Sequence, residues 1–400
     1  MVVDVSEVAL IPLGQPRQLG DSARQARKRV ALRADCLTRL GPRSAGGSLP
    51  GRMRRTWVLI VLTGVVTAAA GAAHYGGASS LLTFAIATVA LAGLAWIVSF
   101  STEQVGERFG PAVTGLLQST LGNLPEFFIV VFALSAGEIV VARTSIVGSI
   151  FANALFVLGL AIIAGCRESA DGVMRFHPRL PKDNAILMML ASFLIVILGI
   201  SAASGDRASH HVKAISIVGA VALLVTYCVW LVDYVRSDAE LEPSHGVPRV
   251  SMVVALALLG AAGVAAAFVS DWFVTALTPA MDRVGVPKAF AGLVIVGIAG
   301  NAVENTTGVV LAMKGEADLA ISVVKNSVAQ ITAFLFPALV LVSLLFATPL
   351  TFALAPVYIG SLLLTAIALW QITGDGEATR FEGVALIALY VILAVLTFFE

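Results

Sequence analysis

Apolar stretches close to twenty residues long recur along the chain from residue 56 to its end. A helix needs about 20 mostly apolar residues to cross the hydrocarbon core of a bilayer, so each stretch is a candidate transmembrane helix. Eleven are predicted, at 56–74, 80–100, 112–136, 143–165, 184–204, 212–235, 250–272, 289–313, 318–346, 350–371 and 381–399. Only 13% of the residues are charged, against about 25% in soluble domains. The chain is therefore predicted to be an all-α polytopic membrane protein.

The first 55 residues differ from the rest, because they hold eleven Lys/Arg and four Asp/Glu without a long apolar run. We expect a basic, disordered cytosolic tail at 1–55 rather than an amphipathic helix on anionic lipid. Alternatively, Met53 is the natural start and residues 1–52 are not expressed. The first transmembrane helix and its loop are predicted at 56–79.

Positive charge is distributed unevenly between the two predicted sides of the membrane. With a cytosolic N-terminus, the cytosolic segments carry twenty Lys/Arg, and the external loops carry five: Arg143, Arg207, Lys213, Arg283 and Lys288. The positive-inside rule then predicts a cytosolic N-terminus and an external C-terminus. The three cysteines are widely separated and indicate neither a disulfide framework nor a zinc site.

The chain repeats itself at a constant offset of 178 residues, and the shared residues include carboxylates, an amide and a hydroxyl. The matched pairs are Gly122/Gly300, Asn123/Asn301, Glu126/Glu304, Gly137/Gly315, Glu138/Glu316, Ala142/Ala320, Ser149/Ser327 and Phe156/Phe334. The second copy begins five spans after the first, so the halves cross the membrane in opposite directions, as in secondary transporters. We expect one helix followed by two inverted five-helix repeats, at 80–236 and 250–400, joined by a cytosolic linker at 237–249.

Glu126 and Glu304 are the most costly residues of the repeat, because a charge at the bilayer centre costs about 2.5–3.5 kcal/mol on the insertion scale. Each lies 14 or 15 residues into its predicted span, within the hydrocarbon core. We predict that they share a midplane site rather than serve as separate structural carboxylates. The flanking polar residues predicted to complete the site are Asn123, Ser149, Asn153, Asn301, Ser327 and Gln330.

The predicted site contains only oxygen ligands. Gly122, Pro125 and Gly300 weaken the helical hydrogen-bond ladder beside the glutamates, so freed carbonyl oxygens are expected to join them. Carboxylate, amide, hydroxyl and carbonyl oxygens suit a hard cation such as Ca²⁺. Glu126 and Glu304 are therefore the predicted metal ligands.

Two long stretches resemble a known family. The sequences "TEQVGERFGPAVTGLLQSTLGNLPEFFI" and "GIAGNAVENTTGVVLAMKGEADLAISVVKNSVAQITAFLFP" resemble the two α-repeats of the cation/proton exchanger branch of the Ca²⁺/cation antiporter superfamily. The resemblance covers nearly everything from the second span onward and implies eleven spans divided as one plus five plus five. It implies that Glu126 and Glu304 bind the cation and the proton. Glu103 is expected to be a cytosolic loop charge, or alternatively to line the entry, because it matches the Thr-Glu pair of the family.

The chain also departs from the family pattern. Asn305 stands where the family often has His, so a proton relay is not expected there. Lys325 replaces a small apolar residue, and we expect it to snorkel to the cytosolic interface or form a structural ion pair rather than act in the site. Glu138 and Glu316 are expected to be solvated loop carboxylates. Gln118, Ala152, Asn326 and Val328 depart from the pattern as well.

Charge predicts the mechanism. Two ionised glutamates neutralise a divalent cation, whereas in its absence their repulsion and desolvation favour protonation. We therefore predict Ca²⁺/H⁺ exchange by alternating access in a bacterial plasma membrane, exporting cytosolic Ca²⁺. Ca²⁺ and protons are the expected substrates and the lipid bilayer the expected partner, with no cofactor and no nucleic acid.

Three other functions compete with Ca²⁺/H⁺ exchange. The substitutions at 325, 326 and 328 leave open an exchanger of Na⁺ or another cation for protons. A passive cation channel is less consistent with the sequence, because two halves with different polar residues fit a single midplane site better than a ring of residues around a pore. A membrane enzyme is not expected, because the sequence contains no H-E-x-x-H, G-x-S-x-G or G-K-[ST] motif.

Overall fold

The computed structural model describes residues 49–106, 108, 121–177, 179–238 and 248–400, but not the side chains of 49–53, 179–185, 234–238, 303 and 304. The chain divides into two compact units, Met1–Thr56 and Trp57–Glu400. Residues 1–48 of the predicted tail at 1–55 lie outside the described residues. Its last residues, from Leu49, begin the first described helix.

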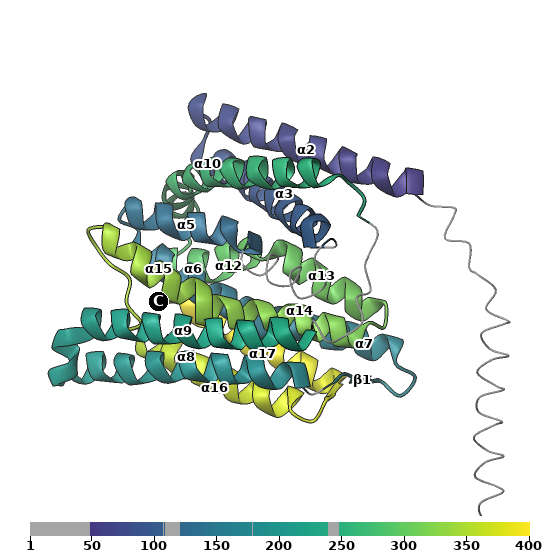
Figure 1. Ribbon diagram of the computed structural model, residues 1–400. Helices are drawn as coiled ribbons and strands as arrows, with labels where there is room; N and C mark the ends of the chain where they lie inside the picture. Colours follow the sequence, from purple (N-terminus) through teal and green to yellow (C-terminus); the bar gives the residue numbers. More distant parts are fainter. Residues whose placement is uncertain (1–48, 107, 109–120, 178, 239–247) are drawn as a thin grey trace, which may run out of the picture. The chain divides into compact units, whose positions relative to one another are not determined.

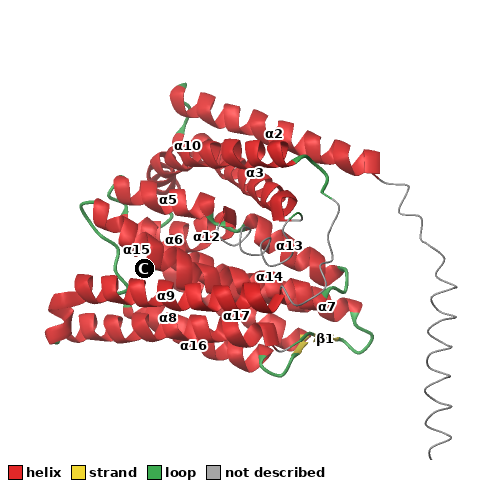
Figure 2. Ribbon diagram, viewed as in Figure 1, coloured by secondary structure: helices red, strands yellow, loops and turns green. Residues whose placement is uncertain are grey.

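From Trp57 onward the described residues are almost entirely helical (Figure 2). The elements up to residue 238 are α2 (Leu49–Tyr75), α3 (Ser80–Gly106), α5 (Leu124–Ser135), α6 (Ile139–Phe151), η1 (Ala152–Val157), α7 (Leu158–Glu168), β1 (Val173–Arg175), α8 (Arg179–Ser204), η2 (Arg207–His211) and α9 (Val212–Asp238). The later elements are α10 (Met252–Val284), α11 (Lys288–Phe290), η3 (Ala291–Val296), α12 (Gly297–Gly300), α13 (Ala302–Met313), α14 (Ala317–Gln330), η4 (Ile331–Leu335), α15 (Phe336–Val342), η5 (Ser343–Leu345), α16 (Pro356–Thr373), β2 (Glu377–Thr379) and α17 (Arg380–Phe398).

The predicted all-α membrane architecture is confirmed. Among the described residues, nine helices are long and apolar enough to cross a membrane, or ten if the bent pair Lys288–Gly300 and Asn305–Met313 is one span. The remaining predicted span, 112–136, begins outside the described residues, and its later part forms the 12-residue apolar helix α5.

Two details differ from the prediction. The span predicted to end at residue 272 continues as α10 to Val284, because the helix ends only where Gly285 adopts a φ of 69°, in the left-handed region that favours glycine. In addition, β1 and β2 pair antiparallel, so the connection between α7 and α8 is hydrogen-bonded to the connection between α16 and α17.

The 178-residue repeat is also present in the backbone. Helices α5 and α13 begin and end at equivalent residues, and each is followed by a glycine of positive φ, 74° at Gly137 and 76° at Gly315. The π-helical segments η1 and η4 also fall at overlapping positions of the two copies. Single-turn π segments are rare and are often found at functional sites. The two halves therefore share local geometry as well as sequence.

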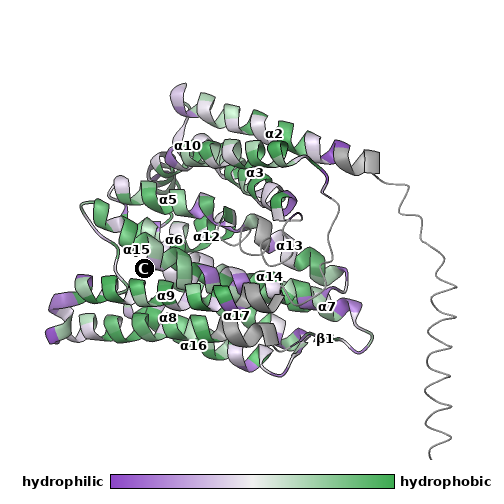
Figure 3. Ribbon diagram, viewed as in Figure 1, coloured by the Kyte–Doolittle hydropathy of each residue, from purple (hydrophilic) through white to green (hydrophobic). Residues whose placement is uncertain are grey.

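Within the unit that starts at Trp57, α2, α3 and α10 form one layer. Helix α10 packs along α3, as Figure 1 shows, while α2 touches this pair where Gly71 meets Trp272 and Thr63 meets Gly93. The layer contacts the other helices through α5, α12 and α13. Figure 3 shows apolar residues along most of the helix lengths, with hydrophilic residues gathered near several helix ends.

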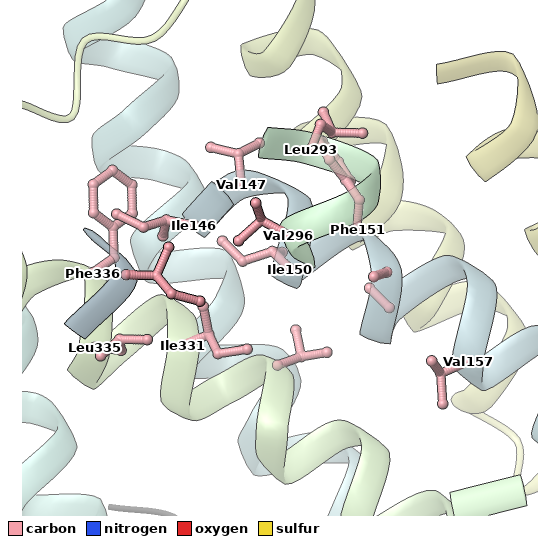
Figure 4. Packing of buried hydrophobic residues seen from close by; sticks show 14 of the residues in the cluster. Ile146, Val147, Ile150, Phe151, Val157, Leu293, Val296, Ile331, Leu335 and Phe336 are labelled. Atoms are coloured by element: carbon pink, nitrogen blue, oxygen red, sulfur yellow. The ribbon is translucent and has the colours of Figure 1, made fainter. Parts of the chain in front are cut away.

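Part of the apolar core lies where α6 crosses η3 and η4. Figure 4 shows side chains of all three segments converging there, and those of Ile150, Leu293 and Ile331 are fully buried. A Cβ at Gly148 would lie 2.2 Å from the Leu293 carbonyl oxygen, so only glycine permits this crossing. Small residues allow close helix packing in lipid, and here they bring the two halves together beside the predicted site.

Candidate cation site

Glu126 occupies the first turn of α5. The preceding residue Asn123 has a non-helical ψ of 10°, and Pro125 stands near the start of the helix, where its missing N–H leaves no helical bond unmade. A carboxylate in this first turn is stabilised by the helix dipole. Local sequence therefore places the Glu126 side chain at a helix start, where it is only 4% exposed.

The Glu126 carboxylate contacts residues from both halves. Its Oε1 atom accepts hydrogen bonds from the Ser149 hydroxyl on α6 and from the Asn301 side-chain amide. A Cβ at Gly300 would lie 2.8 Å from Glu126 Cγ, so the second half approaches the acid as closely as glycine allows. The structure thus brings together Glu126, Ser149 and Asn301, three of the predicted site residues.

The second half contributes a broken helix. Asn301 separates α12 from α13 with a φ of −102° and a ψ of 18°. The Asn301 amide donates to the Gly297 carbonyl (3.0 Å), and the Asn305 amide donates to the Ile298 carbonyl (3.2 Å). These amides satisfy carbonyls of α12 that the break leaves without helical partners. Asn305 therefore makes a structural contact with its own broken helix. The expectation that it is no proton relay stays a prediction.

Several oxygens of the predicted site are buried without a hydrogen-bond partner among the described residues. They are Asn153 Oδ1, Asn301 Oδ1, Asn305 Oδ1 and Ser327 Oγ. An unsatisfied buried polar atom costs about 1–3 kcal/mol, so such atoms are rarely retained without a use. Hydroxyl and amide oxygens of this kind are suitable ligands for a hard cation.

A small, largely enclosed space, too narrow to hold a water molecule, adjoins the Glu126 carboxylate. The residues that line it are Glu126, Val130, Ser145, Ile146, Ser149, Val296 and Leu335. Ser145 was not predicted as a site residue, although it precedes Ser149 by four positions and so shares its helix face. The 178-residue repeat does not point to Ser145, because the equivalent residue of the second half, Val323, has no hydroxyl group.

The other predicted residues are placed as follows. Ser327 and Gln330 lie buried on α14, and Asn123 and Asn153 are buried as well. The backbone of Glu304 belongs to α13, whereas its side chain lies outside the described residues. Glu103 is half-buried near the end of α3. No hydrogen bond among the described residues joins it to Glu126.

Lys325 is hydrogen-bonded to a neighbouring helix. Its side chain is 5% exposed, and its ammonium group donates a hydrogen bond to Thr373 Oγ1 on α16. Among the described residues the ammonium meets a hydroxyl rather than a carboxylate, so the expected structural ion pair is not formed. Snorkelling toward the cytosolic interface stays a prediction. The contact directs Lys325 toward the last turn of α16.

The chain is similar to known proteins over most of its length. The sodium/calcium exchanger protein family matches residues 79–233 and 254–399. The Ca²⁺/H⁺ antiporter ChaA of Bacillus subtilis strain 168 is 29% identical, with 86% of this chain and 99% of the relative covered. The vacuolar calcium ion transporter of Schizosaccharomyces pombe is 30% identical, over 79% of this chain and 78% of the relative. The solved structure of native YfkE superimposes with a TM-score of 0.73 at 26% identity, covering 86% of this chain and all of that one.

Proposed function

Because the chain belongs to the sodium/calcium exchanger protein family, we propose that it exchanges Ca²⁺ for protons by alternating access, with Glu126 binding both ions. The relatives from Bacillus subtilis and from Aphanothece halophytica are named Ca²⁺/H⁺ antiporters. YfkE is likewise described as a Ca²⁺/H⁺ antiporter protein. The chain spans almost the whole length of these relatives.

One observation carries the proposal: Glu126 from the first half is hydrogen-bonded to Asn301 from the second. A carboxylate held between inverted halves lies where secondary transporters place their substrate. The oxygens of Asn153, Asn301 and Ser327 that have no hydrogen-bond partner among the described residues supply further ligands of the class that Ca²⁺ prefers. In this mechanism Glu304, its repeat mate, is the second acid.

Exchange follows from competition for the same oxygens. The ionised carboxylate binds Ca²⁺ through oxygens that otherwise hold a proton. Protonation removes the negative charge that an isolated carboxylate would carry in a low-dielectric site. Loaded and protonated forms then change access, whereas the empty charged form does not. With a cytosolic N-terminus, as the positive-inside bias supports, the proton gradient across a bacterial plasma membrane would expel Ca²⁺.

The test is ion flux in proteoliposomes with an imposed pH gradient. The parent protein is expected to move Ca²⁺ against proton flow, and Glu126→Gln is expected to abolish exchange while still inserting. Glu316→Gln is the matched control, because it makes the same chemical change at an exposed carboxylate of the repeat. Normal exchange by Glu126→Gln contradicts the site assignment.

The same assay separates the remaining alternatives. A panel of Ca²⁺, Na⁺, Mn²⁺ and Cd²⁺ tests the selectivity that the substitutions at 325, 326 and 328 leave open. Cation flux without opposite proton movement would indicate a channel. No cofactor takes part in the proposed cycle, since Ca²⁺ and protons are both substrates.

A further inference from the structure

Glu138 forms a polar cluster at the turn between α5 and α6. Its carboxylate pairs with the Lys288 ammonium, with Nζ 3.0 Å from Oε1 and 2.9 Å from Oε2. It also accepts a hydrogen bond from Thr278 Oγ1 at 2.9 Å. The Glu138 side chain is 22% exposed and that of Lys288 is 37% exposed. Glu138 is therefore a paired, half-buried group, and its prediction as a solvated loop carboxylate is wrong.

The cluster adds a polar contact between the two halves. Glu138 belongs to the first repeat half, whereas Thr278 on α10 and Lys288 at the start of α11 belong to the second. Helix α10 packs along α3 in one layer and meets α5 of the neighbouring layer. The bond from Thr278 to Glu138 therefore ties the α3–α10 layer to the helices that carry the candidate cation site.

The repeat mate of Glu138 has no such contacts. Glu316 occupies the equivalent turn with nearly the same backbone, a φ of −87° and a ψ of 61° against −83° and 61°. Its side chain is exposed and makes no hydrogen bond or ion pair among the described residues. Because the halves are inverted, the two turns lie at opposite ends of the bundle. At the Glu316 end the halves are joined by other residues, because the Asp318 carboxylate accepts a hydrogen bond from the His177 backbone N–H at 2.5 Å. The Glu138 cluster itself therefore has no repeat counterpart among the described residues.

The cluster is directly connected to the candidate site. Helix α5 has Glu126 in its first turn and ends just before Glu138, so twelve residues separate the two, about 18 Å along a helix. Helix α6 begins at the same turn and carries Ser145 and Ser149, which line the space beside Glu126. Movement of this turn therefore displaces both helices that shape the site.

We propose that Glu138, Lys288 and Thr278 form a latch that closes this end of the bundle and breaks when the Glu126 site opens toward it. The inference rests on the proposed antiport, because only alternating access requires both ends to open in turn. The ion pair holds Glu138 in place, and Thr278 connects it to α10. Loss of either contact shifts the population toward the conformation that is open at this end.

Labelling of an engineered cysteine tests the latch. Ser145→Cys, with the three native cysteines replaced, reports opening, because Ser145 is 3% exposed and lines the enclosed space. A membrane-impermeant maleimide is added on the side of the Glu138 turn. Thr278→Val is expected to raise the labelling rate about two- to fivefold, the population shift that loss of one weak contact gives. Lys288→Glu, which sets two carboxylates together, is expected to raise it further.

Rescue and control variants make the result decisive. The exchanged pair Glu138→Lys/Lys288→Glu restores opposite charges and is expected to return the rate toward that of the parent. Lys213→Glu is the matched control, because it reverses one exposed charge on α9 that has no ion pair among the described residues, and it should leave labelling unchanged. Parent-rate labelling of both Thr278→Val and Lys288→Glu, in protein that still purifies as a folded species, would overturn the latch. Equally, a swapped pair that labels as fast as the single variant contradicts it.

Labelling does not depend on which ion is transported. Absence of Ca²⁺/H⁺ exchange in the parent, with the expected labelling pattern preserved, would therefore reject the proposed function and leave the latch standing. Normal exchange without any change in labelling would reject the latch alone.

Discussion

The side-chain amide of Asn301 donates one hydrogen bond to Glu126 Oε1 and another to the Gly297 carbonyl. A single residue of the second half therefore orients the acid of the first half and fixes the break between α12 and α13. Its own oxygen, Asn301 Oδ1, is buried without a hydrogen-bond partner among the described residues. The position of the carboxylate and the geometry of the broken helix are thus coupled.

Replacing Asn301 with Ala should weaken cation binding. The substitution removes both donated hydrogen bonds and one buried oxygen, so we expect the Ca²⁺ KM to rise about tenfold, equivalent to roughly 1.4 kcal/mol. Concentration-dependent uptake in proteoliposomes measures this change. Gln371→Ala, which removes an exposed amide on α16, is the control. An unchanged KM in Asn301→Ala would show that Glu126 needs no support from the second half.

A methyl group at residue 300 should disturb the same carboxylate. A Cβ there would lie 2.8 Å from Glu126 Cγ and 2.9 Å from Oε1, which forces the acid away from Ser149 and Asn301. We expect Gly300→Ala to lower exchange at least about tenfold, at an overpacking cost of about 1–3 kcal/mol.

Gly360→Ala provides the matched control for this glycine. A Cβ at Gly360 on α16 meets nothing within 4 Å, and alanine favours a helix over glycine by about 0.5–1 kcal/mol. We expect normal exchange and unchanged or slightly higher thermal stability in this variant. Exchange that is equally impaired in both variants would argue for a general effect of added side chains.

Much of the candidate site was predictable because polar residues in apolar spans are conspicuous. The constant offset of 178 residues singled out Glu126, Ser149 and Asn301 before any contact was known, and the inverted direction of the halves predicted their convergence. The structure brings these three side chains together. The predicted role of Glu304 stays a prediction, because its side chain lies outside the described residues.

Other features depend on how helices rotate and pack, which spacing alone does not specify. The bond between Lys325 and Thr373 joins residues 48 positions apart, and the Glu138–Lys288 pair joins residues 150 positions apart. No repeat or motif connects the members of either pair. The β1–β2 pairing was equally hidden, because three-residue strands have too little periodicity to recognise.

The buried Lys325 ammonium permits a test of structural against site roles. Replacement of a buried charge by an apolar side chain of similar volume is often neutral or stabilising, so Lys325→Met should retain thermal stability and exchange. Thr373→Val instead leaves the ammonium without its hydroxyl partner and should destabilise the protein by about 1–3 kcal/mol. Thermal unfolding in detergent, together with flux, distinguishes the variants. Altered ion selectivity in Lys325→Met would assign the residue to the site instead.

Asp171 should make the connection between α7 and α8 sensitive to acid. Its carboxylate pairs with Arg175 at 2.7 Å, and this contact, with hydrogen bonds from Ser169 and the Val173 amide, lowers the Asp171 pKa to about 2. A lowered folded-state pKa contributes stability that is complete above about pH 4 and is lost as the pH falls toward 2. In the parent, the backbone amides of residues 172–177 should therefore become better protected from hydrogen exchange as the pH rises from about 2 to about 4. In Asp171→Asn these amides should exchange faster at pH 5, and their protection should lose this pH dependence. Asp282→Asn on α10 is the control and should match the parent. Identical pH profiles for all three proteins would show that Asp171 is not the cause.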